Sequence, residues 1–192
     1  MKIRNALRDI VETAVLALAM FLIVQISMES KKVEGSSMQP TMGTGQRILV
    51  NKLLYSQVDM NMVSKLIPFY KTYSSQGSFL FHPPRRGEVL VFKYPKDPSR
   101  DFVKRVIGLP GETIEVRNGL VYINGEYLEE SYVKSLSRAS IGPIEIEAYT
   151  YFVMGDNRTS SSDSRDWGTL PLDHVIGKAW MRYWPLSKVN LI

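Results

Sequence analysis

Cysteine is absent from this chain of 192 residues, and histidine occurs only twice. The absence of cysteine excludes disulfide bonds and thiolate metal ligands. The two histidines, His82 and His174, are isolated, and Asp97, Asp101 and Glu88 do not cluster at metal-ligand spacing. Neither histidine lies in a segment that resembles part of a catalytic triad. We therefore expect no metal site, no cofactor and no histidine-based nucleophile.

The chain also lacks any long block of residues of one charge, although its net charge is +5. A basic excess occurs in proteins that bind nucleic acid or anionic membranes. Here 24 lysines and arginines are scattered among 19 acidic residues, which is typical of an ordinary solvated surface. We therefore expect no nucleic-acid partner. The length of 192 residues suits one domain with attachments or two small domains, and hydrophobic residues, 44% of the chain, are enough for a sizeable core.

The chain has one long apolar run, and it lies near the N-terminus. Ile10–Met28 spans 19 residues with Glu12 as the only charge. As a helix it is about 28 Å long, close to a bilayer core of ~30 Å. Its fully apolar part, Ala14–Val24, also resembles the hydrophobic region of a cleavable signal peptide. No small-x-small cleavage site follows, which favours an uncleaved anchor, and apolar residues all round the helix disfavour a buried amphipathic helix.

The residues ahead of this run carry a basic excess over one acidic residue, with basic side chains at Lys2, Arg4 and Arg8. Basic segments beside a membrane helix usually stay in the cytoplasm. We therefore predict a cytoplasmic tail over residues 1–9, a transmembrane anchor over residues 10–28, and an extracytoplasmic domain over residues 29–192.

Beyond the anchor, short β-like runs are separated by glycine and proline. Frequent strands with few helical periods predict a mainly β domain built on an antiparallel sheet. Asn118-Gly119 is a strong hairpin signal between two of the strands. The predicted strands are Arg47–Asn51, Glu88–Lys93, Phe102–Ile107, Thr113–Val116, Leu120–Ile123, Thr150–Met154 and Val175–Tyr183.

Two stretches between the strands are predicted to be surface insertions, at about residues 55–86 and 129–149. The first carries enough apolar residues for a short helix, which packs on the sheet or touches lipid or substrate. The second is mostly polar.

Two short motifs carry the chemistry. Ser37 lies in Gly35–Thr41, and Lys104 lies between the apolar pairs Phe102-Val103 and Val106-Ile107. A serine hydroxyl is a poor nucleophile until a base takes its proton. A lysine serves as that base when burial lowers its pKa towards neutrality. The two motifs together predict a serine–lysine dyad for acyl transfer.

A third motif, Gly155–Arg165, reads on polarity alone as a serine-rich loop. Together with the other two it closely resembles the bacterial type I signal peptidases, the membrane-bound leader peptidases of the serine–lysine class. The resemblance spans almost the whole chain and includes the anchor, Arg86–Phe92 and Lys104–Gly111. The small size and single anchor are similar to the short Gram-positive enzymes. The resemblance implies an antiparallel β-sheet catalytic domain behind a single transmembrane helix.

The resemblance also implies roles for individual residues. Ser37 matches the nucleophile, Lys104 the general base, and Ser161 the hydroxyl that orients the base. The backbone N–H of Ser37 matches the oxyanion donor, and Gly35 stands where some relatives add a hydroxyl. The resemblance further implies a structural ion-pair group made of Asp163, Arg165 and Arg105. Met38 matches a residue that lines the site.

The implied activity is removal of signal peptides from exported preproteins, by cutting after a small-x-small site through an acyl-enzyme. The strands expected around Glu29–Ser36 and Asp101–Val103 would pair with an extended substrate peptide as an added strand. The implied location is the bacterial cell membrane, with signal peptides and membrane lipid as partners. Glu112 and Met42 stand where aspartate and leucine are commoner in the family, and both changes are conservative.

Two alternatives remain at this stage. The first is another serine–lysine protease, such as an autocleaving SOS-type repressor, which needs a DNA-binding domain where this chain has an anchor. The second is a catalytically inactive, membrane-tethered relative that binds exported peptides. Such a relative is expected to have lost Ser37 or Lys104, and both are present.

Overall fold

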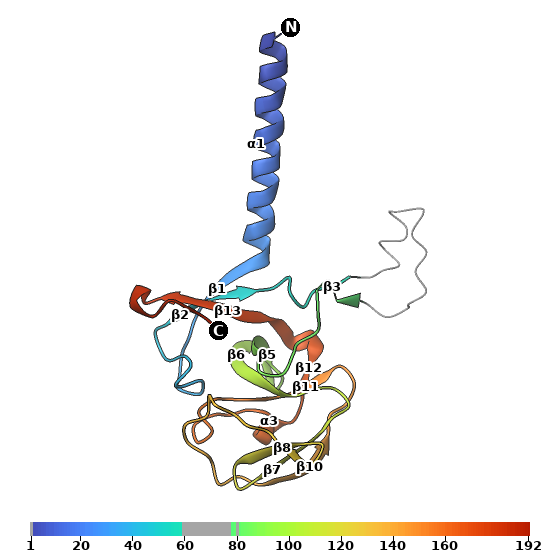
Figure 1. The fold of residues 1–192 in the computed structure, drawn as a ribbon, viewed down its shortest axis with the longest axis vertical. Coiled ribbons are helices and arrows are strands. Elements are labelled where there is room, and N and C mark those ends of the chain that lie inside the picture. The colour runs from blue at the N-terminus through green and yellow to red at the C-terminus, as the bar shows by residue number, and fades with distance from the viewer. Residues whose placement is uncertain (1, 59–77, 80) are drawn as a thin grey trace.

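The computed structural model describes residues 2–58, 78–79 and 81–192. The first element is a long helix, α1 (Lys2–Ser27), which projects from the β-rich remainder of the chain (Figure 1). No glycine or proline interrupts the sequence before Gly35, so nothing in it breaks the helix. The helix ends one residue before the predicted end of the anchor, and Met28 begins the first strand.

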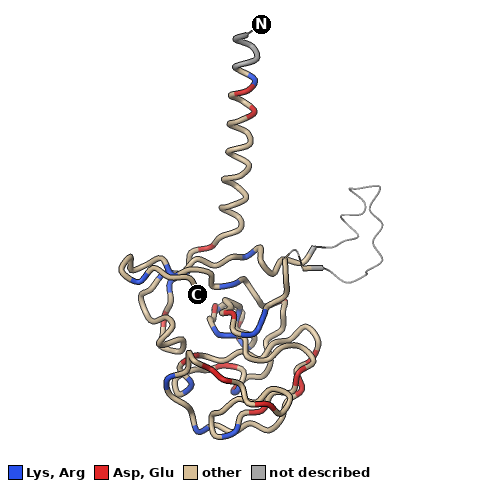
Figure 2. The backbone as a smooth tube through the Cα atoms, viewed as in Figure 1, with Lys and Arg blue, Asp and Glu red and all other residues tan. Residues whose placement is uncertain are grey.

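Within α1, Leu7–Ser27 is long and apolar enough to cross a membrane, by length and composition. Its large side chains, such as Leu16 and Met20, are exposed in the structure. Figure 2 shows no charged residue on the helix between Glu12 and the strand at its foot. An apolar surface of this length without protein cover fits a lipid environment.

The described strands pair antiparallel throughout, as the spacing of the strand signals predicts. The main sheet has eight strands, seven of them in the order β1-β2-β13-β5-β6-β11-β12, with β14 paired to β13. Its strands are β1 (Met28–Lys32), β2 (Arg47–Asn51), β5 (Val89–Tyr94), β6 (Asp97–Gly108), β11 (Thr150–Met154), β12 (Leu170–Pro171), β13 (Val175–Trp184) and β14 (Asn190–Leu191).

A second sheet of four strands lies in the order β10-β7-β8-β9, at the end of the domain away from α1 (Figure 1). It is built from β7 (Thr113–Arg117), β8 (Leu120–Ile123), β9 (Glu126–Tyr127) and β10 (Ile141–Glu145). The smaller elements are β3 (Gln57–Val58) paired with β4 (Ser78–Phe79), α3 (Ser164–Trp167), and two 3-10 turns, η1 (Leu172–His174) and η2 (Leu186–Lys188).

The two predicted insertions differ in what the structure describes. Residues 59–77 and 80 of the first lie outside the described residues. The second, residues 129–149, contains β10, which pairs with β7. Ile146, just after β10, is 1% exposed and packs in the core between the sheets, so part of this stretch belongs to the fold.

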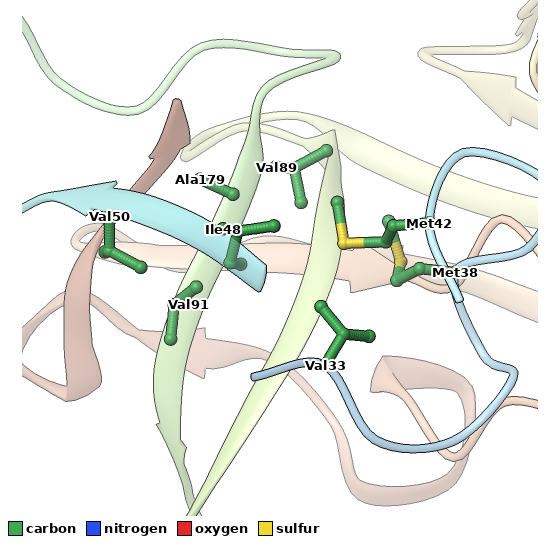
Figure 3. Close-up of a cluster of buried hydrophobic side chains, with 8 residues drawn as sticks. All are labelled: Val33, Met38, Met42, Ile48, Val50, Val89, Val91 and Ala179. Carbon is green, nitrogen blue, oxygen red and sulfur yellow. The ribbon is translucent and has the colours of Figure 1, made fainter. Parts of the chain in front are cut away.

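One hydrophobic cluster contains Met38 and Met42, which come soon after Ser37 in the sequence (Figure 3). Met38 and Met42 enter it from the turn, and a backbone hydrogen bond of 2.9 Å links Met42 N–H to Met38 C=O. Val33 enters it from just after β1, and the strands supply the rest of its buried side chains, namely Ile48, Val50, Val89, Val91 and Ala179. Side chains alternate between the faces of a strand, which places Ile48 and Val50 together on the inner face of β2. The cluster thereby fixes the Ser37 turn to the sheet.

Candidate active site

An open cavity of about 420 Å³ separates two segments of the main sheet that are distant in sequence. Residues 31–34 form one wall, residues 100–104 form the other, and Ser37 and Lys104 both line it. Lys31 Nζ lies 2.8 Å from Asp101 Oδ2, so an ion pair joins the walls. β1 is the edge strand of the sheet, and in the described residues the first half of β6 pairs only with β5. The cavity is therefore flanked by backbone with unpaired hydrogen-bonding groups.

The two residues predicted to form the dyad meet in this cavity. Lys104 Nζ lies 2.9 Å from Ser37 Oγ and donates a second hydrogen bond of 3.1 Å to the Val103 carbonyl. Lys104 comes from the middle of β6 and is 4% exposed. Its ammonium position lies 5.3 Å from the centre of the Phe102 ring. A serine hydroxyl and a buried amine at this distance have the geometry of a nucleophile and its base.

Burial lowers the pKa of Lys104 to about 8, from an ordinary value of 10.5. Desolvation is the largest cause, because an ammonium loses its hydration inside the protein. The Asp163 and Asp156 carboxylates oppose this shift, and the Arg165 guanidinium adds to it. A sizeable fraction of Lys104 is therefore neutral near pH 8 and able to accept a proton.

The turn that carries Ser37 is held on both sides. The Ser37 carbonyl accepts a hydrogen bond of 2.9 Å from the backbone N–H of Asn157. The neighbouring Met38 side chain is 1% exposed and packs in the cluster of Figure 3. Met38 was expected to line the site, but other members of the cluster line the cavity instead. Met38 anchors the nucleophile from behind and does not line the cavity.

Gly155 separates Ser161 from the nucleophile turn. A Cβ added at Gly155 would lie 2.2 Å from Ser161 Oγ and 2.5 Å from the Ser37 carbonyl oxygen, so only glycine fits there. Ser161 Oγ is buried beside the Asp163 carboxylate, whose pKa it helps to lower, and it meets no partner at full hydrogen-bond geometry among the described residues. The structure therefore brings Ser161 to the nucleophile turn, within reach of Asp163.

Asp163 and Arg165 form a buried ion pair, with Arg165 Nε 2.7 Å from Asp163 Oδ1. Asp163 is also the N-cap of α3 and accepts a hydrogen bond of 2.9 Å from the Gly155 N–H. Burial by itself would raise the pKa of the Asp163 carboxyl. The charge and hydrogen bonds of Arg165, together with the Gly155 N–H, hold that pKa below its ordinary value. Asp163 is therefore an anion that fixes the loop behind the dyad.

Arg105 belongs to a different ion pair from the one expected. Its Nε and Nη2 donate to Asp156 Oδ1 and Oδ2 at 2.8 and 2.7 Å, and its Nη1 donates to the Gly87 carbonyl. Lys104 and Arg105 are consecutive on β6, so their side chains leave opposite faces of the strand. Arg105 therefore braces the far side of β6, while Asp163 and Arg165 lie nearer the lysine.

Asp156 and Thr41 received no role from the sequence. Asp156 has a fully buried side chain, and it accepts hydrogen bonds from Arg105 and from the Thr41 hydroxyl. This links the serine motif, the lysine motif and the third motif in one network. The sequence signal for this network was an arginine in the lysine motif and an aspartate in the third motif. The sequence did not show which of the charged residues pair with one another.

No group of three residues able to hold a metal ion occurs in the part of the chain that the structure describes. The two histidines each approach a backbone carbonyl. His82 Nδ1 lies 2.7 Å from Pro83 O, and His174 Nδ1 lies 3.1 Å from Lys93 O.

Comparison with known proteins shows similarity over nearly the whole chain. The family model described as signal peptidase, peptidase S26, matches residues 7–184. Signal peptidase I of Leptolyngbya laminosa is 36% identical over 170 residues, covering 84% of this chain and 71% of the relative. Probable signal peptidase I-1 of Synechocystis sp. is 32% identical over 190 residues, covering 95% and 85%. Signal peptidase IB of Staphylococcus aureus is 30% identical over 203 residues, covering 96% and 93%. The chain therefore belongs to the signal peptidase family, peptidase S26.

Proposed function

We propose that this protein is a membrane-bound endopeptidase that removes signal peptides from exported preproteins with Ser37 as nucleophile and Lys104 as general base. One observation carries the proposal: the buried Lys104 Nζ lies 2.9 Å from Ser37 Oγ at the edge of the cavity between β1 and β6. Family membership supports the activity, and this distance supports the mechanism.

In the proposed reaction, neutral Lys104 accepts the proton of Ser37 as the oxygen attacks the scissile carbonyl. The developing oxyanion faces the backbone N–H of Ser37, which has no acceptor among the described residues. Such donors usually supply the largest electrostatic term in acyl transfer. Protonated Lys104 then gives its proton to the leaving amine, and the peptide bond breaks. A water molecule, deprotonated by the same lysine, hydrolyses the acyl-enzyme and frees Ser37.

The proposal assigns Ser161 the role of holding the Lys104 ammonium during the reaction. Its buried hydroxyl lies at the nucleophile turn, beside the Asp163 carboxylate. It also packs against the same glycine as the Ser37 carbonyl.

The substrate is proposed to bind as an extended strand between residues 31–34 and residues 100–103. Both walls line the cavity, and open sheet edges bind peptides through backbone hydrogen bonds. Small side chains at the first and third positions before the cut would enter the space beside Ser37. This gives the expected preference for a small-x-small site.

The proposed membrane orientation follows from the basic residues in the first turns of α1, ahead of its apolar part, from which we infer that the N-terminus lies in the cytoplasm and the β domain outside. Ser37 lies nine residues after Met28. An extended chain of that length reaches at most about 30 Å, so Ser37 lies close to the membrane surface. A signal peptide held in the bilayer would present its cleavage site in the same zone.

The proposal is tested with a purified preprotein that carries an Ala-x-Ala site, in detergent with added lipid. The wild-type protein is expected to cut after the second alanine, as located by mass spectrometry of both products. The Ser37→Ala protein is expected to leave the preprotein intact. A folded wild-type protein that binds the preprotein without cutting it would indicate a peptide-binding relative instead.

The pH dependence of cleavage provides a second test. Because Lys104 must be neutral to act as base and its pKa is lowered to about 8, activity is lost as pH falls through that value. We expect kcat/KM to fall about tenfold for each pH unit well below the pKa and to level off above it. Rates measured between about pH 6 and pH 10 give the midpoint. A profile flat across this range would contradict the role of Lys104 as base.

A further inference from the structure

Three arginines hold the loop behind the dyad, each through a different contact. Arg105 pairs with Asp156 through two hydrogen bonds. Arg158 Nε donates to the Gly155 carbonyl at 3.2 Å. Arg165 pairs with Asp163, whose carboxylate in turn accepts the Gly155 N–H. The three arginines therefore converge on Gly155 and Asp156, the residues that pack against the nucleophile turn.

The opposite side of every one of these arginines faces a short segment, Glu130–Ser137, from the stretch that the sequence predicted to be a surface insertion. Glu130 Oε1 accepts a hydrogen bond from Arg158 Nη2. The Tyr132 ring centre lies 4.1 Å from the Arg105 guanidinium carbon. Ser137 Oγ accepts a hydrogen bond of 3.1 Å from Arg165 Nη1. One segment therefore contacts all three arginines.

The Glu130 contact is a buried ion pair, unlike the other two contacts. The Arg158 side chain is 0% exposed and that of Glu130 is 7% exposed. A buried guanidinium without a counter-charge is unstable, and removing one partner of a buried pair is strongly destabilising for the other. Arg158 Nη1 already lacks a hydrogen-bond partner among the described residues, so this arginine depends heavily on Glu130.

Tyr132 contacts both Glu130 and Arg105. Its hydroxyl donates to Glu130 Oε1 at 2.7 Å while its ring stacks on Arg105. Burial is the main reason that the pKa of Tyr132 is raised, and the charge of Glu130 adds to it. The phenol therefore remains a hydrogen-bond donor throughout the working pH range.

We propose that Glu130 and Tyr132 are positioning residues for the reaction. They act through Arg158 and Arg105 on the Gly155–Asn157 loop, which fixes the Ser37 turn. The segment Glu130–Ser137 thus works as a back support of the active site. This inference rests on the proposed Ser37–Lys104 mechanism. Neither residue touches the reacting atoms, so loss of either displaces the dyad without removing a chemical group.

The test is steady-state kinetics of preprotein cleavage by Glu130→Ala, Glu130→Gln and Glu129→Ala. A displacement of the dyad by about 1 Å lowers kcat about 100-fold, which is the loss expected for Glu130→Ala with KM within about twofold of wild type. Glu130→Gln keeps the size of the side chain and an acceptor oxygen. We expect its kcat to be about tenfold higher than that of Glu130→Ala. Glu129 is an exposed neighbour with the same side chain, so Glu129→Ala is the matched control and is expected to behave as wild type.

Tyr132 supplies an independent pair of variants. Tyr132→Phe removes only the hydroxyl that donates to Glu130, and Tyr132→Leu also removes the ring under Arg105. The expected order of kcat is wild type, then Tyr132→Phe, then Tyr132→Leu, again with little change in KM. Circular dichroism and thermal unfolding show which variants are folded. If Glu130→Ala does not fold, the comparison uses Glu130→Gln and Tyr132→Phe, which change the fewest atoms.

The outcomes separate this inference from the proposed function. If wild type cuts through Ser37 but folded Glu130 and Tyr132 variants match Glu129→Ala in kcat, the positioning role is refuted and the dyad stands. If the loss appears in KM alone, the segment acts on substrate binding and the positioning role is again refuted. If wild type does not cut, or Ser37→Ala does, the proposed function itself fails.

Discussion

Replacing Lys104 by methionine is expected to lower kcat for preprotein cleavage about 10⁴-fold, the upper range for loss of a general base. Methionine matches the length of the lysine stem and suits a site that is 4% exposed. The variant keeps the packing on Phe102 but has no atom that can accept the Ser37 proton. The loss is therefore chemical, and KM and thermal stability are expected to change little.

The control for this variant is Lys93→Met. Lys93 lies on β5, the strand paired with β6, and its side chain is exposed. It tests the effect of exchanging a lysine for methionine on the same sheet without touching the dyad. A Lys104→Met protein that cuts within about tenfold of the wild-type rate would show that another group takes the proton.

Replacing Gly155 by alanine is expected to damage both activity and stability. The new Cβ would lie 2.2 Å from Ser161 Oγ and 2.5 Å from the Ser37 carbonyl oxygen. Rotation of the serine side chain does not relieve the clash, because Ser161 Cβ is also only 2.6 Å away, and the Ser37 carbonyl is backbone that moves only if the nucleophile moves. Overpacking of this kind costs about 1–3 kcal/mol of folding free energy. A displaced nucleophile costs about 100-fold in kcat.

Kinetics and thermal unfolding of Gly155→Ala and Gly142→Ala measure these two effects. Gly142 lies in β10, and a Cβ added there has nothing within 4 Å. Gly142→Ala is therefore expected to keep the wild-type rate and midpoint of unfolding. A Gly155→Ala protein with wild-type activity would mean that the Ser37 turn is not held against Gly155 as the structure has it.

Much of the sheet was predictable from the sequence because its strands carry local signals. The runs at Arg47–Asn51 and Thr150–Met154 match β2 and β11 in extent, since alternating or wholly apolar runs bounded by turn residues identify buried strands. β10 was not predicted, for the opposite reason. Ile141–Glu145 contains Gly142 and Pro143, which weaken a strand pattern.

The proximity of Ser37 and Lys104 was predicted only from their chemistry, because a serine nucleophile needs a base and a lysine among apolar residues can supply one. Their 2.9 Å contact depends on pairings between strands far apart in sequence. The same holds for Arg105. Its charge was visible in the sequence, but whether it faces Asp156 or Asp163 is set by which side of β6 it leaves. Met38 was misplaced for a similar reason, since the turn sends it into the core.

The proposed role of residues 130–137 was not predicted from the sequence, because polar residues between strands normally lie on the surface. Glu130 looks no different in sequence from its neighbour Glu129. Only the fold shows that Glu130 meets the buried Arg158 while Glu129 faces solvent.

We propose that Ser37, and not its neighbour Ser36, attacks the peptide bond. The most direct measurement compares wild type, Ser37→Ala and Ser36→Ala in the same preprotein cleavage assay, with fold verified for each. We predict no detectable product from Ser37→Ala and a rate within about twofold of wild type from Ser36→Ala, because only the Ser37 hydroxyl meets Lys104. Cleavage at the same bond by folded Ser37→Ala protein would contradict this prediction.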